Sequence, residues 1–352
     1  MLWPTTSQTV MDGKLTLEKI GALAGVSRAT VSRVINHHPN IREEVRQRVM
    51  QVIAETGYQP NQAARSLASN RTGLLGLVIP QVIQALFTDL YYPRLIQGIS
   101  QACNESGQTL ALFIFHTEEE EQQLTAQVMR QGFLDGLIIA GMHFGAPLNQ
   151  LLLSEKPVMV IGEPLDFPQA SFVDVDNRLG AVTAVSHLIS LGHQRIATIT
   201  GRLDMAAGQQ RRQGYLDALT AHNRPSDEAL IVAGDFEQDK AYQGTLELLP
   251  HQPDAIFVAS DSMALSALRA LADAGLQVPR DVAVVGYDDL ASEGTAVPLI
   301  NPPLTTIRQP IHRMGVQAVA TLLDLIKNPQ APPRRVILPT ELIIRQSCGA
   351  GP

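Results

Sequence analysis

The sequence predicts a small N-terminal all-α headpiece of the helix-turn-helix type, followed by an α/β core of two doubly wound parallel-sheet lobes. In the first part, residues 14–59, apolar residues recur at helical spacing and no strand pattern appears. From Leu74 onward, continuous apolar stretches alternate with amphipathic helical patterns, which is typical of a parallel sheet covered by helices on both faces. These units are too many for one compact sheet, so we expect two similar lobes.

Composition narrows the class of protein. The chain has 352 residues, of which 45% are hydrophobic and 17% charged, enough apolar material for two or three buried cores. No apolar run is long enough to span a bilayer, and the N-terminus lacks the pattern of a secretory signal. Cys103 and Cys348 are too few for a disulfide framework or a metal site. We therefore expect a cytoplasmic protein with reduced thiols, no metal, no cofactor and no membrane contact.

The charge is unevenly distributed along the chain. The net charge is −7, yet residues 14–72 contain nine Lys and Arg and four acidic residues, which leaves −12 on the remainder. A basic head on an acidic body is expected when only the head meets nucleic acid. Residues 1–13 have no periodic pattern and are predicted to be a disordered tail, with Met11 as an alternative start of translation.

The segment Thr16–Asn36 predicts two short helices joined by a tight turn. Leu17, Ile20, Leu23 and Ala24 are expected to form one buried face, and Gly25 to end the first helix. The N-cap of the second helix is expected at Ser27. The second helix then exposes a face of short and basic side chains that suits the major groove of DNA: Arg28, Ala29, Thr30, Ser32 and Arg33. A surface hairpin with solvated charges is the alternative interpretation.

A third amphipathic helix is predicted from the apolar spacing between Ile41 and Ile53, ending at Gly57, with Tyr58 packed against it. Residues 60–72 follow as a linker, with good helix formers and one large apolar residue, Leu67. On the pattern alone, this segment is a linker with a short stub of helix.

The stretch AGVSRATVSRVIN, residues 24–36, resembles the N-terminal signature of the lactose-repressor/galactose-repressor family of bacterial transcription regulators. The resemblance implies that residues 60–72 form a hinge helix that orders on operator DNA and inserts a leucine into the minor groove. The DNA-contacting residues that it implies are Thr16, Ser27, Arg28, Ala29, Thr30, Ser32, Arg33, Asn36, Asn61, Ala64 and Leu67.

The core, residues 73–347, resembles periplasmic sugar-binding proteins, as the core of that family does. We expect a first lobe from about 73–175 and 308–332, and a second lobe from about 176–307 and 333–347. A final single strand is expected over Arg335–Ile344. The other strands are predicted at Leu74–Ile79, Leu110–Phe115, Gly136–Ile139, Val158–Ile161, Ala197–Thr200, Ala255–Val258 and Val282–Val285.

Ligands of open α/β sheets bind beyond the carboxyl ends of the strands, and two facing lobes would place those ends across a cleft. Carboxylates, an arginine fork and aromatic faces there suit a polyhydroxylated ligand. The resemblance supports Arg211, Phe236, Ser260-Asp261 and Asp288 most directly. The full set of candidate effector-binding residues is Phe87, Asp89, Tyr91, Arg211, Phe236, Ser260, Asp261 and Asp288.

Several of these polar residues also have structural interpretations. Asp261 precedes a helical pattern, so capping the helix and binding a ligand are both open for it. Asp176-Asn177 is interpreted as a helix cap, Tyr287 as a candidate core residue, and Glu118–Glu121 as a solvated helix start. Gln210 stands where related sugar regulators commonly have an acid, which leaves the identity of the sugar open.

The resemblance implies a homodimer that binds a near-palindromic operator in double-stranded DNA and responds to a small effector, such as a mono- or oligosaccharide. It is expected to repress carbohydrate-utilisation genes. The alternative is an enzyme built on the α/β core. The chain has no P-loop, GxSxG or HExxH motif. We therefore expect no catalytic residues.

Overall fold

The computed structural model describes residues 15–35, 38–58, 71–80, 89–115, 117–130, 133–141, 147–290 and 301–350. The chain divides into two compact units, residues 1–72 and 73–352, which are described separately. The predicted tail and residues 60–70 of the predicted hinge segment lie outside the described residues. So do five candidate site residues, Asn36, Asn61, Ala64, Leu67 and Phe87.

The headpiece has three helices, α1 (Leu17–Ala24), α2 (Arg28–Ile35) and α3 (Glu43–Thr56). Their boundaries follow the predicted capping residues. The Ser27 hydroxyl accepts the backbone N–H of Thr30 at 3.1 Å, which caps α2. Both α1 and α3 end at a glycine in the left-handed conformation, Gly25 (φ 65°) and Gly57 (φ 63°).

One predicted core residue of the headpiece is wrong. Leu23 is 49% exposed, whereas Ile20 and Ala24 are buried together with Val31 and Val34. The buried face of α1 is rotated toward Gly21, because the turn into α2 passes close to this residue. A Cβ there would lie 2.7 Å from the carbonyl oxygen of Val26. Tyr58 packs on this core, as predicted.

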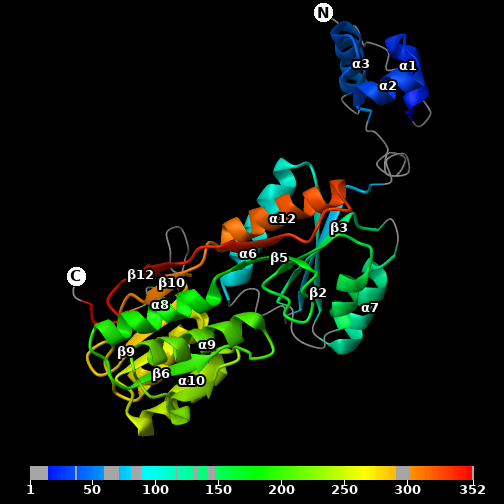
Figure 1. Ribbon diagram of the computed structural model, residues 1–352. Coiled ribbons are helices and arrows are strands. Elements are labelled where there is room, and N and C mark those ends of the chain that lie inside the picture. Colours follow the sequence, from blue (N-terminus) through cyan, green and yellow to red (C-terminus); the bar gives the residue numbers. More distant parts are fainter. Residues whose placement is uncertain are drawn as a thin grey trace, which may run out of the picture. The chain divides into compact units, whose positions relative to one another are not determined.

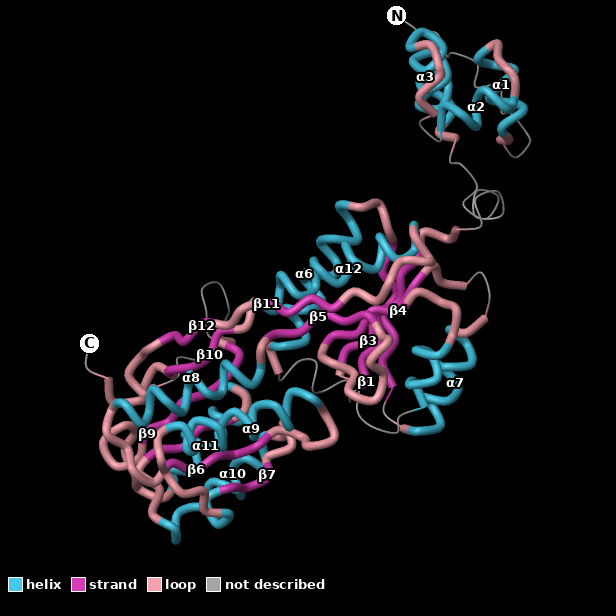
Figure 2. Tube along the Cα trace, in the orientation of Figure 1, coloured by secondary structure: helices cyan, strands magenta, loops and turns pink. Residues whose placement is uncertain are grey.

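The core contains two six-stranded sheets, drawn in magenta in Figure 2. The first sheet has the order β11-β5-β4-β3-β1-β2 and all its strand pairs are parallel. Its strands are β1 (Leu74–Pro80), β2 (Thr109–Phe115), β3 (Gly136–Ala140), β4 (Val158–Ile161), β5 (Ser171–Val175) and β11 (Arg335–Leu338).

The second sheet has the order β12-β10-β9-β8-β6-β7, in which only the β10–β12 pair is antiparallel. Its strands are β6 (Ile196–Thr200), β7 (Ile231–Ala233), β8 (Ala255–Val258), β9 (Ala283–Asp288), β10 (Thr305–Arg308) and β12 (Glu341–Ile343). All seven strands predicted before the final one occur, Val158–Ile161 and Ala255–Val258 with the predicted bounds and the other five with shifts at their ends. The strands β5, β7 and β10 were not predicted, because they are short or carry a polar residue such as Asp174.

Helices cover both sheets (Figure 1). The first lobe has α6 (Tyr91–Glu105), α7 (Glu118–Val128), η1 (Pro147–Leu153) and α12 (Ile311–Lys327). The second lobe has α8 (Asn177–Ser190), α9 (Ala206–Ala221), η2 (Glu228–Leu230), α10 (Gln238–Leu248), η3 (Leu249–His251) and α11 (Asp261–Asp273). In Figure 1, α6 and α12 lie side by side. They meet at Gly98, where a Cβ would lie 2.1 Å from the carbonyl oxygen of His312.

The predicted final strand over Arg335–Ile344 is wrong, and so is the assignment of residues 333–347 to one lobe. The segment forms two strands in different sheets, because β11 pairs with β5 in the first lobe and β12 pairs with β10 in the second. Pro339 lies between them and has no backbone N–H to continue a ladder. The chain therefore crosses between the lobes after β5, after β10 and after β11.

Candidate functional site

A cavity of about 820 Å³ lies at the carboxyl ends of the strands of both sheets. This is the position predicted for a ligand of two facing α/β lobes. Its first-lobe lining includes Pro80, Asp89, Tyr91, Tyr92, Phe115, Thr117, Glu121, Gly162 and Asp174. Its second-lobe lining includes Arg202, Met205, Arg211, Asp235, Phe236, Glu237, Asp239, Ser260, Ser262, Asp288 and Gln309.

The cavity brings together six of the eight candidate effector-binding residues: Asp89, Tyr91, Arg211, Phe236, Ser260 and Asp288. Phe87 lies outside the described residues. Asp261 is not part of the lining. These residues come from both lobes, so a ligand in the cavity could contact both lobes at once.

Arg211 on α9 is the buried cation of this site, with 5% of its surface exposed. Its Nε donates to the Asn177 side-chain oxygen at 2.9 Å, and one terminal nitrogen donates to the carbonyl of Ala259 at 2.6 Å. The guanidinium carbon lies 3.7 Å from the ring centroid of Tyr287. Tyr287 is thus a core residue that also supports the guanidinium by a cation–π contact.

Asp288 ends β9 and faces the same guanidinium, with 3.5 Å between Oδ1 and the Arg211 nitrogen. Oδ1 also accepts the side-chain amide of Gln309 at 2.5 Å. Burial raises the pKa of Asp288 to about 7, although Arg211 acts in the opposite direction and Asp89 adds to the rise. A carboxyl group in this state can both donate and accept hydrogen bonds near neutral pH.

Several buried polar residues of the site were not among the candidates, and Asp174 and Asn177 are two of them. Asp174 at the end of β5 is 4% exposed, and burial raises its pKa. It accepts the side-chain amide of Asn177 at 3.0 Å, and Asn177 in turn accepts Arg211. The carboxylate of Asp176 accepts the N–H of Leu179 at 2.8 Å, which confirms its predicted role as a cap. Asp174 could have been recognised in the sequence as a polar residue inside a short buried strand.

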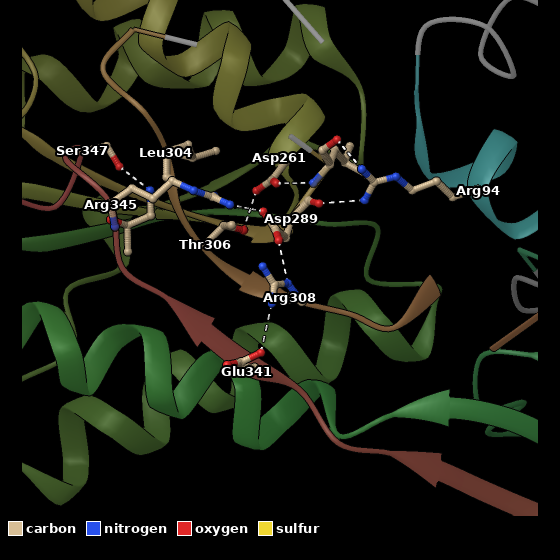
Figure 3. A network of polar contacts seen from close by, with 11 residues as sticks. Arg94, Asp261, Asp289, Leu304, Thr306, Arg308, Glu341, Arg345 and Ser347 are labelled. Atoms are coloured by element: carbon tan, nitrogen blue, oxygen red, sulfur yellow. Dashed lines mark hydrogen bonds and ion pairs between the residues drawn. The ribbon is translucent and has the colours of Figure 1, made fainter. Parts of the chain in front are cut away.

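The Ser260-Asp261 pair separates into two roles. The Ser260 hydroxyl caps α11 by accepting the N–H of Met263 at 3.3 Å and also lines the cavity. Asp261 is not part of the lining. Its carboxylate accepts the hydroxyl of Thr306 at 2.6 Å and the N–H of Leu290 at 2.9 Å (Figure 3). Burial raises its pKa. Asp261 therefore holds β10 and the turn after β9 in place.

The prediction of a solvated helix start at Glu118–Glu121 is wrong for Glu121. Its side chain is 4% exposed, lines the cavity and accepts the N–H of Leu148 at 2.8 Å. Thr117 and Glu120 form a capping box at the start of α7. The capping box fixes the start of α7 and thereby places Glu121 on the inner face of the helix. The prediction failed because a run of four glutamates does not indicate which of them is buried.

The cavity lining carries seven carboxyl groups and two guanidinium groups, both already engaged. Arg202 makes a two-pronged contact with Asp204, with Nε and Oδ1 2.9 Å apart. Arg211 is held by Asn177, Ala259 and Asp288. Apolar and aromatic surface is supplied by Tyr91, Tyr92, Phe115 and Phe236. Such a lining suits a neutral ligand with many hydroxyl groups and disfavours an anion.

The headpiece presents the second candidate site. Ser27, Arg28, Ala29 and Arg33 are exposed, while Thr30 and Ser32 are half-buried. The Arg28 guanidinium lies 3.1 Å from the carboxylate of Glu18 on α1. Two candidates also hold helix ends, because Thr16 caps α1 and Ser27 caps α2.

In the described part of the chain, no helix has the length and apolar character needed to cross a membrane. Among the same residues, no group of three or more His, Cys, Asp or Glu side chains could hold a metal ion.

Comparison with known proteins identifies the two parts of the chain. Residues 16–61 match bacterial regulatory proteins of the lacI family, and residues 185–348 match a periplasmic binding protein-like domain. The chain is 41% identical to the HTH-type transcriptional regulator CelR of Thermobifida fusca over 337 residues, 94% of this chain and 98% of that one. It is 33% identical to the ribose operon repressor of Escherichia coli K12 over 94% of this chain and 99% of the repressor.

Two solved structures are similar over nearly the whole chain. One is the complex of transcriptional regulator CelR with cellobiose, with a TM-score of 0.74 and 39% identity over 95% of this chain and 99% of that one. The other is a lac repressor dimer bound to operator and the anti-inducer ONPF, with a TM-score of 0.79 and 27% identity over 96% and 100% of the two chains.

The raised pKa of Asp288 predicts a pH dependence of stability. The pKa is about 7 in the folded protein and about 3.9 in an unfolded chain. Between these values the folded state binds more protons, so the free energy of unfolding falls as pH rises, by up to about 1.4 kcal/mol per pH unit for one group. Asp288→Asn keeps an acceptor for Gln309 but cannot ionise, and should lose less stability than wild type between about pH 5 and 7.

Urea unfolding at several pH values measures this difference. Asp281→Asn is the matched control, because the hydrogen bond from Arg280 lowers the pKa of Asp281. That carboxylate stabilises the fold above its unfolded pKa and loses its effect only as pH falls through the folded pKa, so its removal should leave the fall above about pH 5 unchanged. Parallel pH profiles for wild type and Asp288→Asn would contradict the assignment.

Proposed function

Because the chain belongs to the LacI family of bacterial regulatory proteins, we propose that it is a dimeric transcriptional repressor that a small neutral sugar releases from its operator. Its place of action would be the cytoplasm, where the operator DNA lies. The relatives named above are transcriptional regulators, and we assign no catalytic role to the cavity.

The observation that carries the proposal is the chemistry of the interlobe cavity. Asp89, Asp174 and Asp288 offer oxygens to sugar hydroxyl groups, and Arg211 holds the pattern in place. Aromatic rings such as Phe236 suit the apolar face of a pyranose. A volume of about 820 Å³ leaves room for more than one ring. We therefore favour an oligosaccharide, for which the cellobiose held by the related CelR structure is a precedent.

The proposed DNA interface is the exposed side of α2 with its flanking residues. A single headpiece touches few bases, so affinity and register require two headpieces on a near-palindromic site. Sugar binding would change the relative angle of the lobes and thereby weaken operator binding. Thermodynamic linkage then requires that the operator weaken sugar binding by the same factor.

A thermal-shift screen tests the ligand class directly. The purified protein is compared with neutral mono- and disaccharides, beginning with cellobiose, and with their phosphate esters. A bound sugar at about 100 times its Kd stabilises the fold by about 2.7 kcal/mol. We expect shifts from a neutral sugar and none from its phosphate, because carboxyl groups outnumber guanidinium groups in the lining. A phosphate ester that binds more tightly than its parent sugar would contradict the proposed ligand class.

Two substitutions in α2 should separate base reading from phosphate contact. Arg28→Ala should relax base preference, with a loss of discrimination of about 1–3 kcal/mol at one position, because arginine reads guanine through two hydrogen bonds. Arg33→Ala should weaken binding about equally on all sequences. Selection from random DNA, followed by binding titrations, measures both. Unchanged specificity of Arg28→Ala would remove Arg28 from base reading.

Asp288 should be needed for the response to sugar but not for binding to DNA. In Asp288→Ala, operator affinity should persist while the neutral sugar no longer releases the operator, since a buried acceptor in the cavity is lost. Operator titrations with and without the sugar measure the response. Asp281→Ala, at an exposed position outside the lining, is the control and should retain the response to sugar. A normal response in Asp288→Ala would exclude Asp288 from the binding site.

A further inference from the structure

The turn that follows β9 has an unusual backbone. Asp288 has φ 120° and Asp289 has φ 56°, both in the region that side chains rarely adopt. Such residues are strained and persist only where the surroundings fix them. The carboxylate of Asp288 lines the cavity, so the strained turn begins at the proposed sugar site.

The second lobe holds this turn from two sides (Figure 3). The carboxylate of Asp289 has no exposed surface and accepts Arg308 Nε at 2.7 Å and an Arg345 terminal nitrogen at 2.6 Å. The N–H of Leu290 donates to Asp261 at 2.9 Å. Arg308 lies at the end of β10, where the chain crosses back to the first lobe.

The first lobe holds the same turn through Arg94 on α6. One terminal nitrogen donates to the carbonyl oxygen of Asp289 at 2.7 Å, and the other donates to that of Leu290 at 2.7 Å. The side chain of Leu290 is 4% exposed and packs in the apolar core of the first lobe with residues such as Leu95. The turn therefore continues a strand of the second sheet and is held by both lobes.

Arg94 itself is not part of the cavity lining. It is also fixed to a rigid element, because α6 packs tightly on α12 at Gly98. A shift of the turn at Asp288 would thus be felt by α6 and α12 together, without any contact between sugar and Arg94.

We propose that Arg94 is a positioning residue that couples occupancy of the cavity to the angle between the lobes, through its two-pronged hold on the turn at Asp289-Leu290. The proposal rests on the proposed function above. Arginine suits this role because its planar fork reaches two carbonyl oxygens at once, whereas lysine presents a single point charge.

Loss of the two hydrogen bonds from Arg94 would destabilise the present arrangement of the lobes relative to the arrangement with a different angle between them. Operator and sugar prefer different arrangements under the proposed function. A shift of the equilibrium therefore moves the two affinities in opposite directions. If Arg94 only stabilised the fold, its loss would instead weaken both affinities and lower the thermal midpoint.

The test compares Arg94→Gln, Arg94→Lys and wild type in titrations with operator DNA and, separately, with the neutral sugar that stabilises wild type, cellobiose first. In Arg94→Gln, the two dissociation constants should shift in opposite directions, with their ratio changed about 5- to 150-fold. Arg94→Lys should lie between that variant and wild type. Arg269→Gln, which removes a surface arginine paired with Asp273, is the matched control and should resemble wild type.

Three results would overturn the proposal: unchanged constants in Arg94→Gln, a change in sugar affinity alone, or a joint weakening with a lowered thermal midpoint. The wild-type titrations separate this failure from that of the proposed function. If wild type binds both ligands and Arg94→Gln behaves like it, only the coupling role is wrong. If no sugar binds wild type, the proposed sugar response fails, and the role of Arg94 fails with it.

Discussion

The guanidinium of Arg211 is buried between three segments of the second lobe and contacts each of them. Asn177 comes from the start of α8, Ala259 from the end of β8, and Asp288 from the end of β9, while the Tyr287 ring supports one face. Removing one partner of such a buried pair costs about 3–5 kcal/mol, because the other charge is left uncompensated. The geometry of the cavity floor depends on this cation more than on any other single group described.

The charge of Arg211 is surrounded by carboxyl groups, and this balance decides which ligands the cavity favours. Carboxyl groups outnumber guanidinium groups in the lining, and burial raises the pKa of Asp89, Asp174 and Asp288. Protein oxygens accept hydrogen bonds from Nε and one terminal nitrogen of Arg211, and Asp288 offsets its charge, so an incoming anion meets an excess of carboxyl groups in the lining. Hydroxyl groups, in contrast, can exchange hydrogen bonds with carboxyl groups in either protonation state. Arg211 and its carboxyl partners thus stabilise the lining of the cavity and also favour neutral ligands over anions.

Most of the fold could be predicted, because local signals determined it. Caps at Ser27 and Asp176, glycine stops at Gly25 and Gly57, and apolar strands such as Ala255–Val258 depend on neighbouring residues only. The candidates Arg211 and Asp288 came from the family resemblance, and a functional role was favoured for them because charged residues that face a cleft of low dielectric need a reason to be there. What could not be predicted depends on contacts distant in sequence. Leu23 is exposed because of the approach of α2, and Glu121 is buried because the N–H of Leu148 meets it. Asp261 supports a turn about thirty residues away instead of a ligand.

The three crossings between the lobes make each lobe discontinuous in sequence. The first lobe consists of residues before α8, the helix α12 and the strand β11, and the second lobe takes the intervening pieces and β12. The headpiece, by contrast, is one continuous segment. A chimaera that exchanges DNA specificity between relatives therefore needs a single junction, whereas one that exchanges a lobe needs a junction at every crossing. Recombination between natural genes meets the same constraint. The headpiece, and with it the operator preference, can therefore be exchanged far more readily than one lobe of the core.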